Sequence, residues 1–275
     1  MATRVKPRSV KSRGTRKTVR RRSSAAASER GDPTRAIYLY GITRSVPSGL
    51  DLPEGVDGAA AVEALKSGGM VCWISRVNRG EFADRLAENM ENLEWLASAS
   101  VRHQRVVGAI AAATDILPAR FGTVFLGDAG LHDDVQSRKA ALTKSLERVT
   151  GTEEWGVKVF AGERPRESVV TASSGKEYLQ RKAKQLQPRS ARAPDEELES
   201  LARELRRVSI DRAVTGKVSG GQRGLEWQAS FLVRRSRRKQ FQEVLKRFAK
   251  RWKDSRRIEC TGPWPPYSFV SSDGR

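Results

Sequence analysis

The pattern of apolar positions predicts strands in the first half of the chain. Residues 36–40 (AIYLY) form a β-rich run that stops at Gly41, and residues 70–77 (MVCWISRV) form a second run that is apolar at nearly every position. A strand that is apolar on both faces is typical of the centre of a sheet. Residues 155–160 (WGVKVF) alternate apolar and polar positions, which predicts another strand. Residues 116–126 (ILPARFGTVFL) predict an extended segment.

Helical spacing recurs between these strands. Apolar residues follow a helical repeat from Glu81 onward, and the pattern continues or restarts until Pro118 ends it. Residues 133–149 form another amphipathic helix. This order of elements predicts an α+β domain of ferredoxin-like type, with helices on one face of an antiparallel or mixed sheet.

The second half repeats the mixture on a smaller scale. It ends in residues 262–270 (GPWPPYSFV), which are too rich in proline for the interior of a strand or helix and predict an extended segment lying against the fold. The expected elements before it are helices at 176–186 and 194–208, strands at 210–218 and 226–233 joined by residues 219–224, a basic helix capped by Ser236, and a short strand at 256–261.

Four regions follow from these patterns. We expect a disordered basic tail over 1–35, because Ser, Thr, Arg and Ala dominate it and little can be buried. An N-terminal α+β domain (36–165) and a smaller C-terminal α+β domain (174–261) come next, and a segment rich in proline and aromatic residues (262–275) follows.

Charge is distributed unevenly over these regions. The chain has 275 residues, with 52 Lys and Arg against 32 Asp and Glu, and a formal net charge of +20. Residues 1–35 contribute +10, residues 36–175 contribute −3, residues 176–257 contribute +14, and the remainder contributes −1. A uniformly basic protein is therefore excluded.

Several classes of protein are excluded or disfavoured by composition. No stretch approaches 18 uncharged apolar residues, so we expect no membrane span. Residues 1–28 have no apolar core of a secretory signal, and their composition fits either a transit peptide or a disordered tail. Cys72 and Cys260 are far apart in strand-like runs, which favours two buried reduced thiols over a disulfide and fits the cytoplasm. With only His103 and His132 besides, we expect no metal site.

The sequence contains no arrangement typical of an enzyme. The glycine-rich run at 216–224 lacks phosphate-binding spacing and precedes a strand, so a hairpin loop is favoured. His103 lies among polar neighbours without a nucleophile, which indicates a surface or boundary position. The carboxylates of Glu153 and Glu154 are adjacent and point different ways, as do those of Asp133 and Asp134. We therefore expect no catalytic site and no cofactor.

Binding is the better-supported kind of function. Residues 234–257 form a basic amphipathic helix that could be a core-packing helix with a solvated basic face, a nucleic-acid binder, a membrane-surface helix or a docking face for an acidic partner. The basic tail adds attraction to any polyanion. An alternative function is therefore a basic nucleic-acid-binding module that uses the tail and this helix.

Two further features concern exposed side chains. Arg120 lies in an apolar extended run, where its guanidinium must reach solvent or be paired, and a structural ion pair or backbone clamp is favoured over a ligand contact. Trp264, Tyr267 and Phe269 would form an exposed patch unless they are docked, and docking onto the fold is favoured over a partner site.

A set of motifs in a fixed order resembles a known family. The runs are YLYGI at 38–42, LEWL at 93–96, His103, PARFGTVF at 118–125, EWGVKV at 154–159, GKEYL at 175–179 and GPWPPYSF at 262–269. From about residue 36 to 270 the chain resembles the gas vesicle protein GvpL/GvpF family. Gln104 stands where the family commonly has glutamate, and the basic tail is not part of the family pattern.

The resemblance implies a function as well as a fold. It implies two α+β domains and a non-enzymatic accessory or minor structural protein of the gas vesicle, in the cytoplasm. The implied partners are the hydrophobic shell protein and other accessory proteins, which it would contact during nucleation and assembly; nucleic acid is not expected. We expect the contact at an open sheet edge or apolar groove of the first domain, with Arg120, Phe121, Trp264 and Tyr267 as candidate partner-binding residues.

Overall fold

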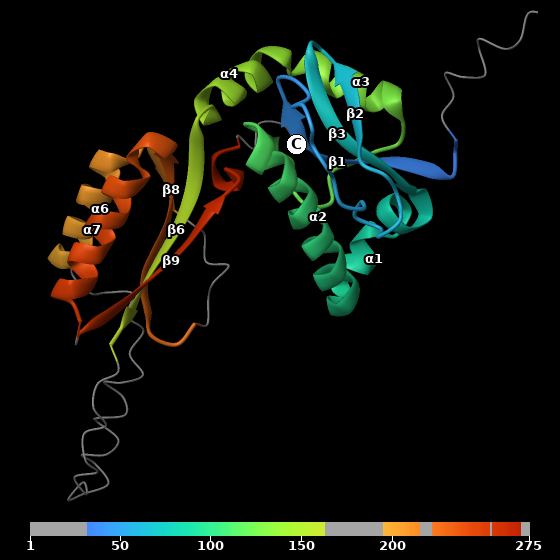
Figure 1. Ribbon diagram of the computed structural model, residues 1–275. Helices are drawn as coiled ribbons and strands as arrows, with labels where there is room; N and C mark the ends of the chain where they lie inside the picture. The colour runs from blue at the N-terminus through green and yellow to red at the C-terminus, as the bar shows by residue number, and fades with distance from the viewer. Residues whose placement is uncertain (1–31, 163–194, 215–221, 254, 271–275) are drawn as a thin grey trace, which may run out of the picture.

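The computed structural model describes residues 32–162, 195–214, 222–253 and 255–270. These residues form two antiparallel sheets with packed helices, which confirms the expected α+β class (Figure 1). Most of the predicted basic tail, the predicted helix at 176–186 and part of the glycine-rich loop lie outside the described residues. No helix in the described ranges is long and apolar enough to cross a bilayer.

The first sheet is built around two strands that are buried on both faces. Its order is β2 (Glu63–Ser67), β3 (Met70–Asn78), β1 (Arg35–Thr43) and β4 (Leu117–Pro118), and β5 (Val124–Phe125) also pairs with β1. The strands predicted at 36–40 and 70–77 are therefore confirmed as β1 and β3. The extended run at 116–126 forms two short strands on either side of a turn.

Helices cover both faces of this sheet, where we expected one. On one face lie the π-helical turn Gly80–Asp84, α1 (Leu86–Glu91) and α2 (Leu93–Ala113); on the other lie α3 (Asp128–Ser137) and α4 (Lys139–Val149). The expectation was wrong because β1 and β3 are apolar at successive positions. Each face then needs its own apolar cover.

The second sheet contains a strand that we had assigned to the first domain. Its order is β7 (Asp211–Ala213), β8 (Leu225–Arg234), β6 (Thr152–Ala161) and β9 (Arg256–Trp264). The predicted strand at 155–160 is β6, and it pairs with β8 and β9. The assignment was wrong because β4 and β5 already occupy the edge of β1, and the chain after α4 runs into the second half (Figure 1).

Two helices cover one face of the second sheet. They are α6 (Glu196–Val208) and α7 (Arg238–Arg251), whose apolar side chains form a core with β6 and β8. Ser236 does not cap α7: the helix begins after the 3₁₀ turn Arg235–Arg237 and has no side-chain cap. The predicted cap was wrong because Ser236 lies inside that turn.

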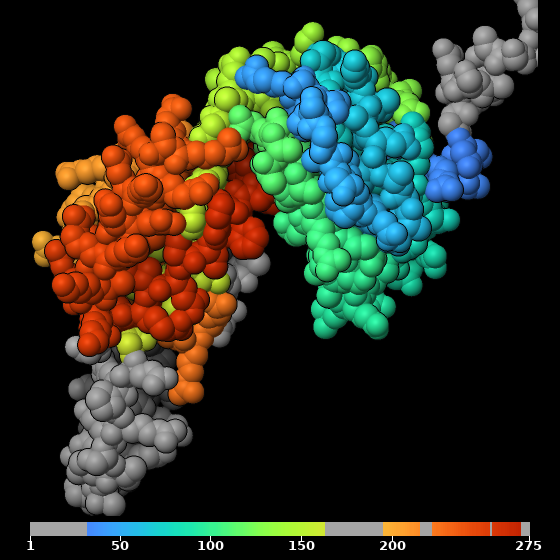
Figure 2. Space-filling view, viewed as in Figure 1, coloured from blue at the N-terminus to red at the C-terminus, as the bar shows by residue number. Residues whose placement is uncertain are grey.

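The C-terminal strand is longer than expected. β9 continues through Pro263 to Trp264, although we expected the strand to end at residue 261. An edge strand tolerates proline because one side of its backbone needs no partner. The chain then forms a 3₁₀ turn, Tyr267–Phe269, at the junction of the two halves. Figure 2 shows a notch in the surface between these halves.

Candidate functional site

His103 lies buried at the centre of the junction between the two halves, with 1% of its surface exposed. The hydroxyl of Tyr38 lies 2.9 Å from Nδ1, and the hydroxyl of Tyr267 lies 3.2 Å from Nε2. The backbone N–H of Gly122 donates to the Tyr38 hydroxyl oxygen at 3.1 Å, so the hydroxyl proton is free to point at Nδ1. This network favours the neutral tautomer with its proton on Nε2.

The expectation of a surface or boundary position for His103 was wrong. The residues beside it in sequence are polar, but Ala99 and Val107, four residues away on either side, are buried on the same helical face. The helical spacing therefore indicates that His103 is buried, whereas its polar neighbours in sequence suggested exposure.

Burial keeps the groups of this network neutral at neutral pH. It lowers the pKa of His103 to about 4 and raises the pKa values of the Tyr38 and Tyr267 hydroxyls above their ordinary range. A general acid or base works best with a pKa near the working pH, and none of these three groups has one. The network is therefore suited to holding structure together.

The RFGTVF motif completes the cluster around His103. The Phe121 ring meets the His103 ring edge-on, with centroids 5.7 Å apart, and also contacts the Tyr38 ring. Gly122 adopts a φ of +80°, a conformation that glycine takes without strain and that helps form the turn carrying the donor N–H. We call Tyr38, His103, Phe121 and Tyr267 the aromatic joint.

The GPWPPYSF motif ties the joint to the second sheet. We call residues 263–270 the strap. The backbone N–H and the hydroxyl of Ser268 donate to the Glu154 carboxylate at 2.8 and 2.6 Å. Phe269 is 4% exposed. The expected docking onto the fold is therefore confirmed for Tyr267 and Phe269, but it is wrong for Trp264, half of whose side chain is exposed.

The adjacent carboxylates of Glu153 and Glu154 do point different ways. Glu153 accepts from Trp155 Nε1 at 2.8 Å and from Arg238 Nε at 2.8 Å, whereas Glu154 binds the strap. Both are buried on β6, although a sequence reading gives them no role beyond local charge. Burial is tolerated because each carboxylate has hydrogen-bond donors.

The four candidate partner-binding residues do not form one site. Phe121 and Tyr267 each contact His103 in the aromatic joint. Arg120 lines one groove together with Phe121, and Trp264 lines a different cavity together with Tyr267. Arg120 is exposed on a groove of about 420 Å³ beside β1, and its side chain has no ion pair or hydrogen bond to any described residue. The expected structural pairing of Arg120 is therefore wrong; its side chain reaches solvent instead.

Trp264 belongs to an apolar cavity next to the joint. It is 50% exposed, and it faces the same cavity as Val101 of α2, which is 51% exposed. We call this cavity the apolar hollow. Its volume is about 590 Å³, and it is lined by Ser100, Val101, Gln104, Arg105, Glu154, Trp264, Pro265 and Tyr267.

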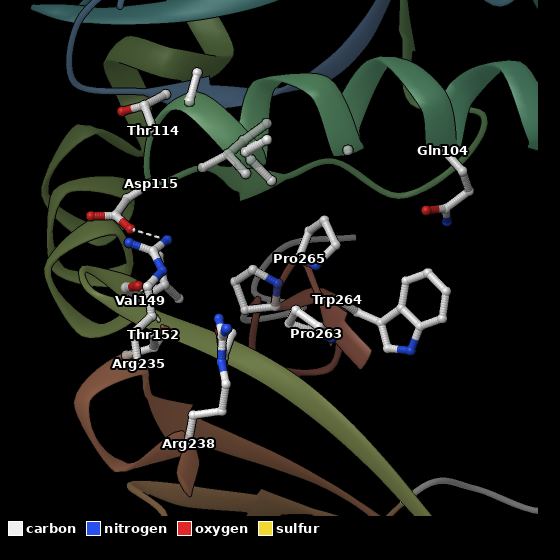
Figure 3. A pocket seen from close by; sticks show the side chains of 17 residues that line it. Gln104, Thr114, Asp115, Val149, Thr152, Arg235, Arg238, Pro263, Trp264 and Pro265 are labelled. Carbon is white, nitrogen blue, oxygen red and sulfur yellow. Dashed lines mark hydrogen bonds and ion pairs between the residues drawn. The ribbon is translucent and has the colours of Figure 1, made fainter. Parts of the chain in front are cut away.

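A second cavity of about 590 Å³ lies on the other side of the strap (Figure 3). It shares Gln104, Trp264 and Pro265 with the apolar hollow. At one end of it Arg235 and Asp115 form an ion pair at 2.8 Å, which links the 3₁₀ turn before α7 to the segment after α2. In Figure 3 the Trp264 indole projects away from the strap, on the side of Gln104.

Neither cavity has the side chains of a metal or redox centre. Nowhere in the described ranges do three or more His, Cys, Asp or Glu side chains gather closely enough to hold a metal ion. Cys72 and Cys260 are both free thiols; Cys72 is buried as expected, but Cys260 is exposed on the edge strand β9. The expected burial of Cys260 is wrong: it pairs with the buried Val157 but lies on the edge strand β9, where its side chain stays exposed.

The motifs that meet at the joint match a family of known proteins. The family described as gas vesicle synthesis protein GvpL/GvpF matches residues 36–271. The chain belongs to the GvpL/GvpF family. The match covers both halves and the strap.

Relatives with names support the same family. The chain is 33% identical over 255 residues to gas vesicle protein L from a Streptomyces species, covering 86% of this chain and 93% of the relative. It is 24% identical over 237 residues to gas vesicle protein F1 of Halobacterium salinarum, with the same coverage of 86% and 93%.

Solved structures show the same fold. The crystal structure of GvpF from an Anabaena species superimposes with a TM-score of 0.61 at 17% identity, over 87% of this chain and 98% of the other. The crystal structure of GvpF from Microcystis aeruginosa gives a TM-score of 0.62 at 17% identity, over 86% and 99%.

Family membership makes this a gas vesicle protein with a vesicle-associated location. The family is a family of gas vesicle proteins and not a known enzyme family. This protein is therefore involved with gas vesicle components.

Proposed function

We propose that this family member binds the hydrophobic shell protein and other accessory proteins during gas vesicle nucleation and assembly, and that it does so without catalysis. The observation that carries the proposal is the apolar hollow. Val101 and Trp264 are large apolar side chains, half exposed, on two walls of one cavity.

The chemistry of a shell subunit explains why such a surface is useful. A subunit that assembles into a gas-facing wall exposes apolar area and strand edges before it is incorporated, and both promote aggregation. A binder with a concave apolar surface removes that area from water and keeps the subunit soluble. The hollow offers this surface from a folded domain, with Arg105 and Glu154 as its polar margin.

Exposed apolar residues are common when they occur singly, but these two occur together. Two large side chains that share one cavity with the buried Pro265 form a contiguous apolar surface. A tryptophan in such a position is the residue type that most often dominates binding energy at protein interfaces.

The aromatic joint keeps the two walls of the hollow in place. Tyr267 and Gln104 both line the hollow, and Tyr267 also contacts His103, the residue before Gln104 on α2. The strap therefore cannot shift relative to α2 without breaking these contacts. We assign Phe121 and Tyr267 a positioning role, and Val101 and Trp264 the direct contact.

A matched pair of double variants tests the proposal. V101S/W264S removes both exposed apolar side chains of the hollow, and V46S/L126S removes two others that are 49% and 64% exposed elsewhere. Each full-length protein is co-purified with its shell protein at low and high salt. We expect the hollow variant to lose the shell protein at both salt concentrations and the control variant to retain it.

The same variants are then placed in a vesicle-forming strain from which the native gene has been deleted. The control variant should restore vesicles and the hollow variant should not. Retention of the shell protein by the hollow variant, together with normal vesicles, would contradict the proposal.

A further inference from the structure

Helix α7 carries a row of lysines on the side that faces away from the core. Its apolar side chains Phe241, Val244, Leu245 and Phe248 are buried against the second sheet. Lys239, Lys246 and Lys250 are seven and four residues apart, so they share one stripe on the opposite side. We call these three residues the lysine stripe.

The positive charges of the lysine stripe are not neutralised by ion pairs within the described residues. All three lysines are exposed, and none forms an ion pair with a described residue. Arginines of the same region differ, because Arg235, Arg238 and Arg247 pair with Asp115, Glu153 and Glu204. Glu243, the one acidic residue of α7, is four residues after Lys239 and three before Lys246, so it lies beside the stripe and leaves an excess of positive charge there.

The start of α7 is also electrostatically unfavourable. The helix has no acidic residue in its first turn, no side-chain cap, and a run of basic residues where the helix dipole is positive. The neighbouring helix α6 has the favourable arrangement, with an Asp195 cap, three glutamates in its first turn and arginines in its last. The helix dipole therefore does not explain the basic residues at the start of α7, although Lys250 and Arg251 in its last turn are placed favourably.

We propose that the lysine stripe binds an acidic helical segment of another protein. The stripe spans 11 residues, or about 17 Å at the rise of an α-helix. Carboxylates spaced seven and four residues apart on a partner helix would face the three lysines in register. The lysine stripe is separate from the apolar hollow. An acidic protein on the stripe would therefore not displace a shell protein bound in the hollow.

The structure favours an acidic protein over the other polyanions. A membrane-surface helix must insert its apolar face, and the apolar face of α7 is buried in the core. Single-stranded nucleic acid is commonly held by stacking on exposed aromatic rings, whereas Phe241 and Phe248 are fully buried. The exposed side of α7 therefore presents three lysines in a row, with Glu243 beside them.

The experiment compares three probes and two variants of the full chain. The probes are a synthetic polyglutamate peptide, a single-stranded RNA and vesicles that contain phosphatidylserine. The variants are K239Q/K246Q/K250Q and a control with the same charge change, K66Q/K139Q/K144Q, at exposed lysines of the first half.

We expect the stripe variant to bind polyglutamate about tenfold more weakly than the unmodified protein, and the control variant to change less than about twofold. RNA and vesicle binding should fall equally in the two variants, because they depend on total charge. Binding of polyglutamate should also weaken with salt.

Two outcomes would overturn the proposal: equal loss of polyglutamate binding in both variants, or a larger loss of RNA or vesicle binding than of polyglutamate binding in the stripe variant. Shell-protein binding at high salt serves as an independent readout. It tests the apolar hollow and is expected to be unchanged in the stripe variant.

Discussion

The aromatic joint and the apolar hollow share one strap but differ in what they do. Tyr267 hydrogen-bonds the buried His103, whereas Trp264, three residues earlier, is half exposed in the hollow. Both come from the same conspicuous GPWPPYSF run. The difference shows that aromatic residues of one motif can divide between holding the fold together and presenting a surface.

Burial is the physical basis of this division. Tyr38 and His103 are removed from water and their polar atoms are paired within the joint, so loss of either partner leaves an unsatisfied group. Val101 and Trp264 already contact water, so their loss changes the folded and unfolded states similarly. Substitutions in the joint should lower stability, and substitutions in the hollow should lower binding.

The largest effect is expected from Y38A. It removes a fully buried ring and leaves both the Gly122 N–H and His103 Nδ1 without their partner. The free energy of unfolding should fall by about 4 kcal/mol. Urea unfolding measures this fall, with V101A as the control at less than about 1 kcal/mol. Equal losses in the two variants would remove the distinction between joint and hollow.

The next effect is a dependence of stability on pH. The folded pKa of His103 is about 4, below its ordinary value of 6.5, so the unfolded chain binds the proton more readily. The contribution is fully present above pH 6.5 and is lost as the pH falls to 4, by about 3 kcal/mol. Unfolding curves at several pH values should show a smaller loss for H103Q than for the unmodified protein. Identical pH profiles would show that His103 is not the responsible group.

A smaller effect is expected from Y267F. The variant keeps the ring in the joint but removes the hydroxyl that lies 3.2 Å from His103 Nε2. Loss of one buried hydrogen bond should lower the free energy of unfolding by about 1 to 2 kcal/mol. Chemical denaturation of both proteins measures the difference, and a change below about 0.3 kcal/mol would mean that this contact does not hold the strap.

The smallest effect on stability is expected from W264S. Half of the Trp264 side chain is exposed, and its indole forms no hydrogen bond to a described residue. The free energy of unfolding should change by less than about 1 kcal/mol. A larger fall, measured in the same urea series, would place Trp264 in the joint and not in the hollow.

Local patterns predicted most of the elements but not how they pair. The apolar runs of β1 and β3 and the helical spacing of α2 and α7 are properties of neighbouring residues, so the sequence contains them. The pairing of β6 depends on which sheet edge is free, which no local pattern encodes. We propose that the boundary between the two domains lies just before β6, at residues 150–151.

The candidate site was predicted in part for the same reason. The aromatic residues of the proline-rich run were expected to dock onto the fold together, but the structure docks Tyr267 and leaves Trp264 half exposed. His103 was misplaced because its polar neighbours in sequence lie on a different face of the helix. Contacts between residues 103 and 267 join distant segments, and only the fold reveals them.

The affinity of the shell protein for W264S is the most direct test of the account. The dissociation constant is measured at high salt for W264S, for Y267F and for the unmodified full-length protein. We predict that W264S binds at least about tenfold more weakly while its free energy of unfolding changes by less than about 1 kcal/mol. An unchanged affinity for W264S would contradict the assignment of the hollow as the binding surface.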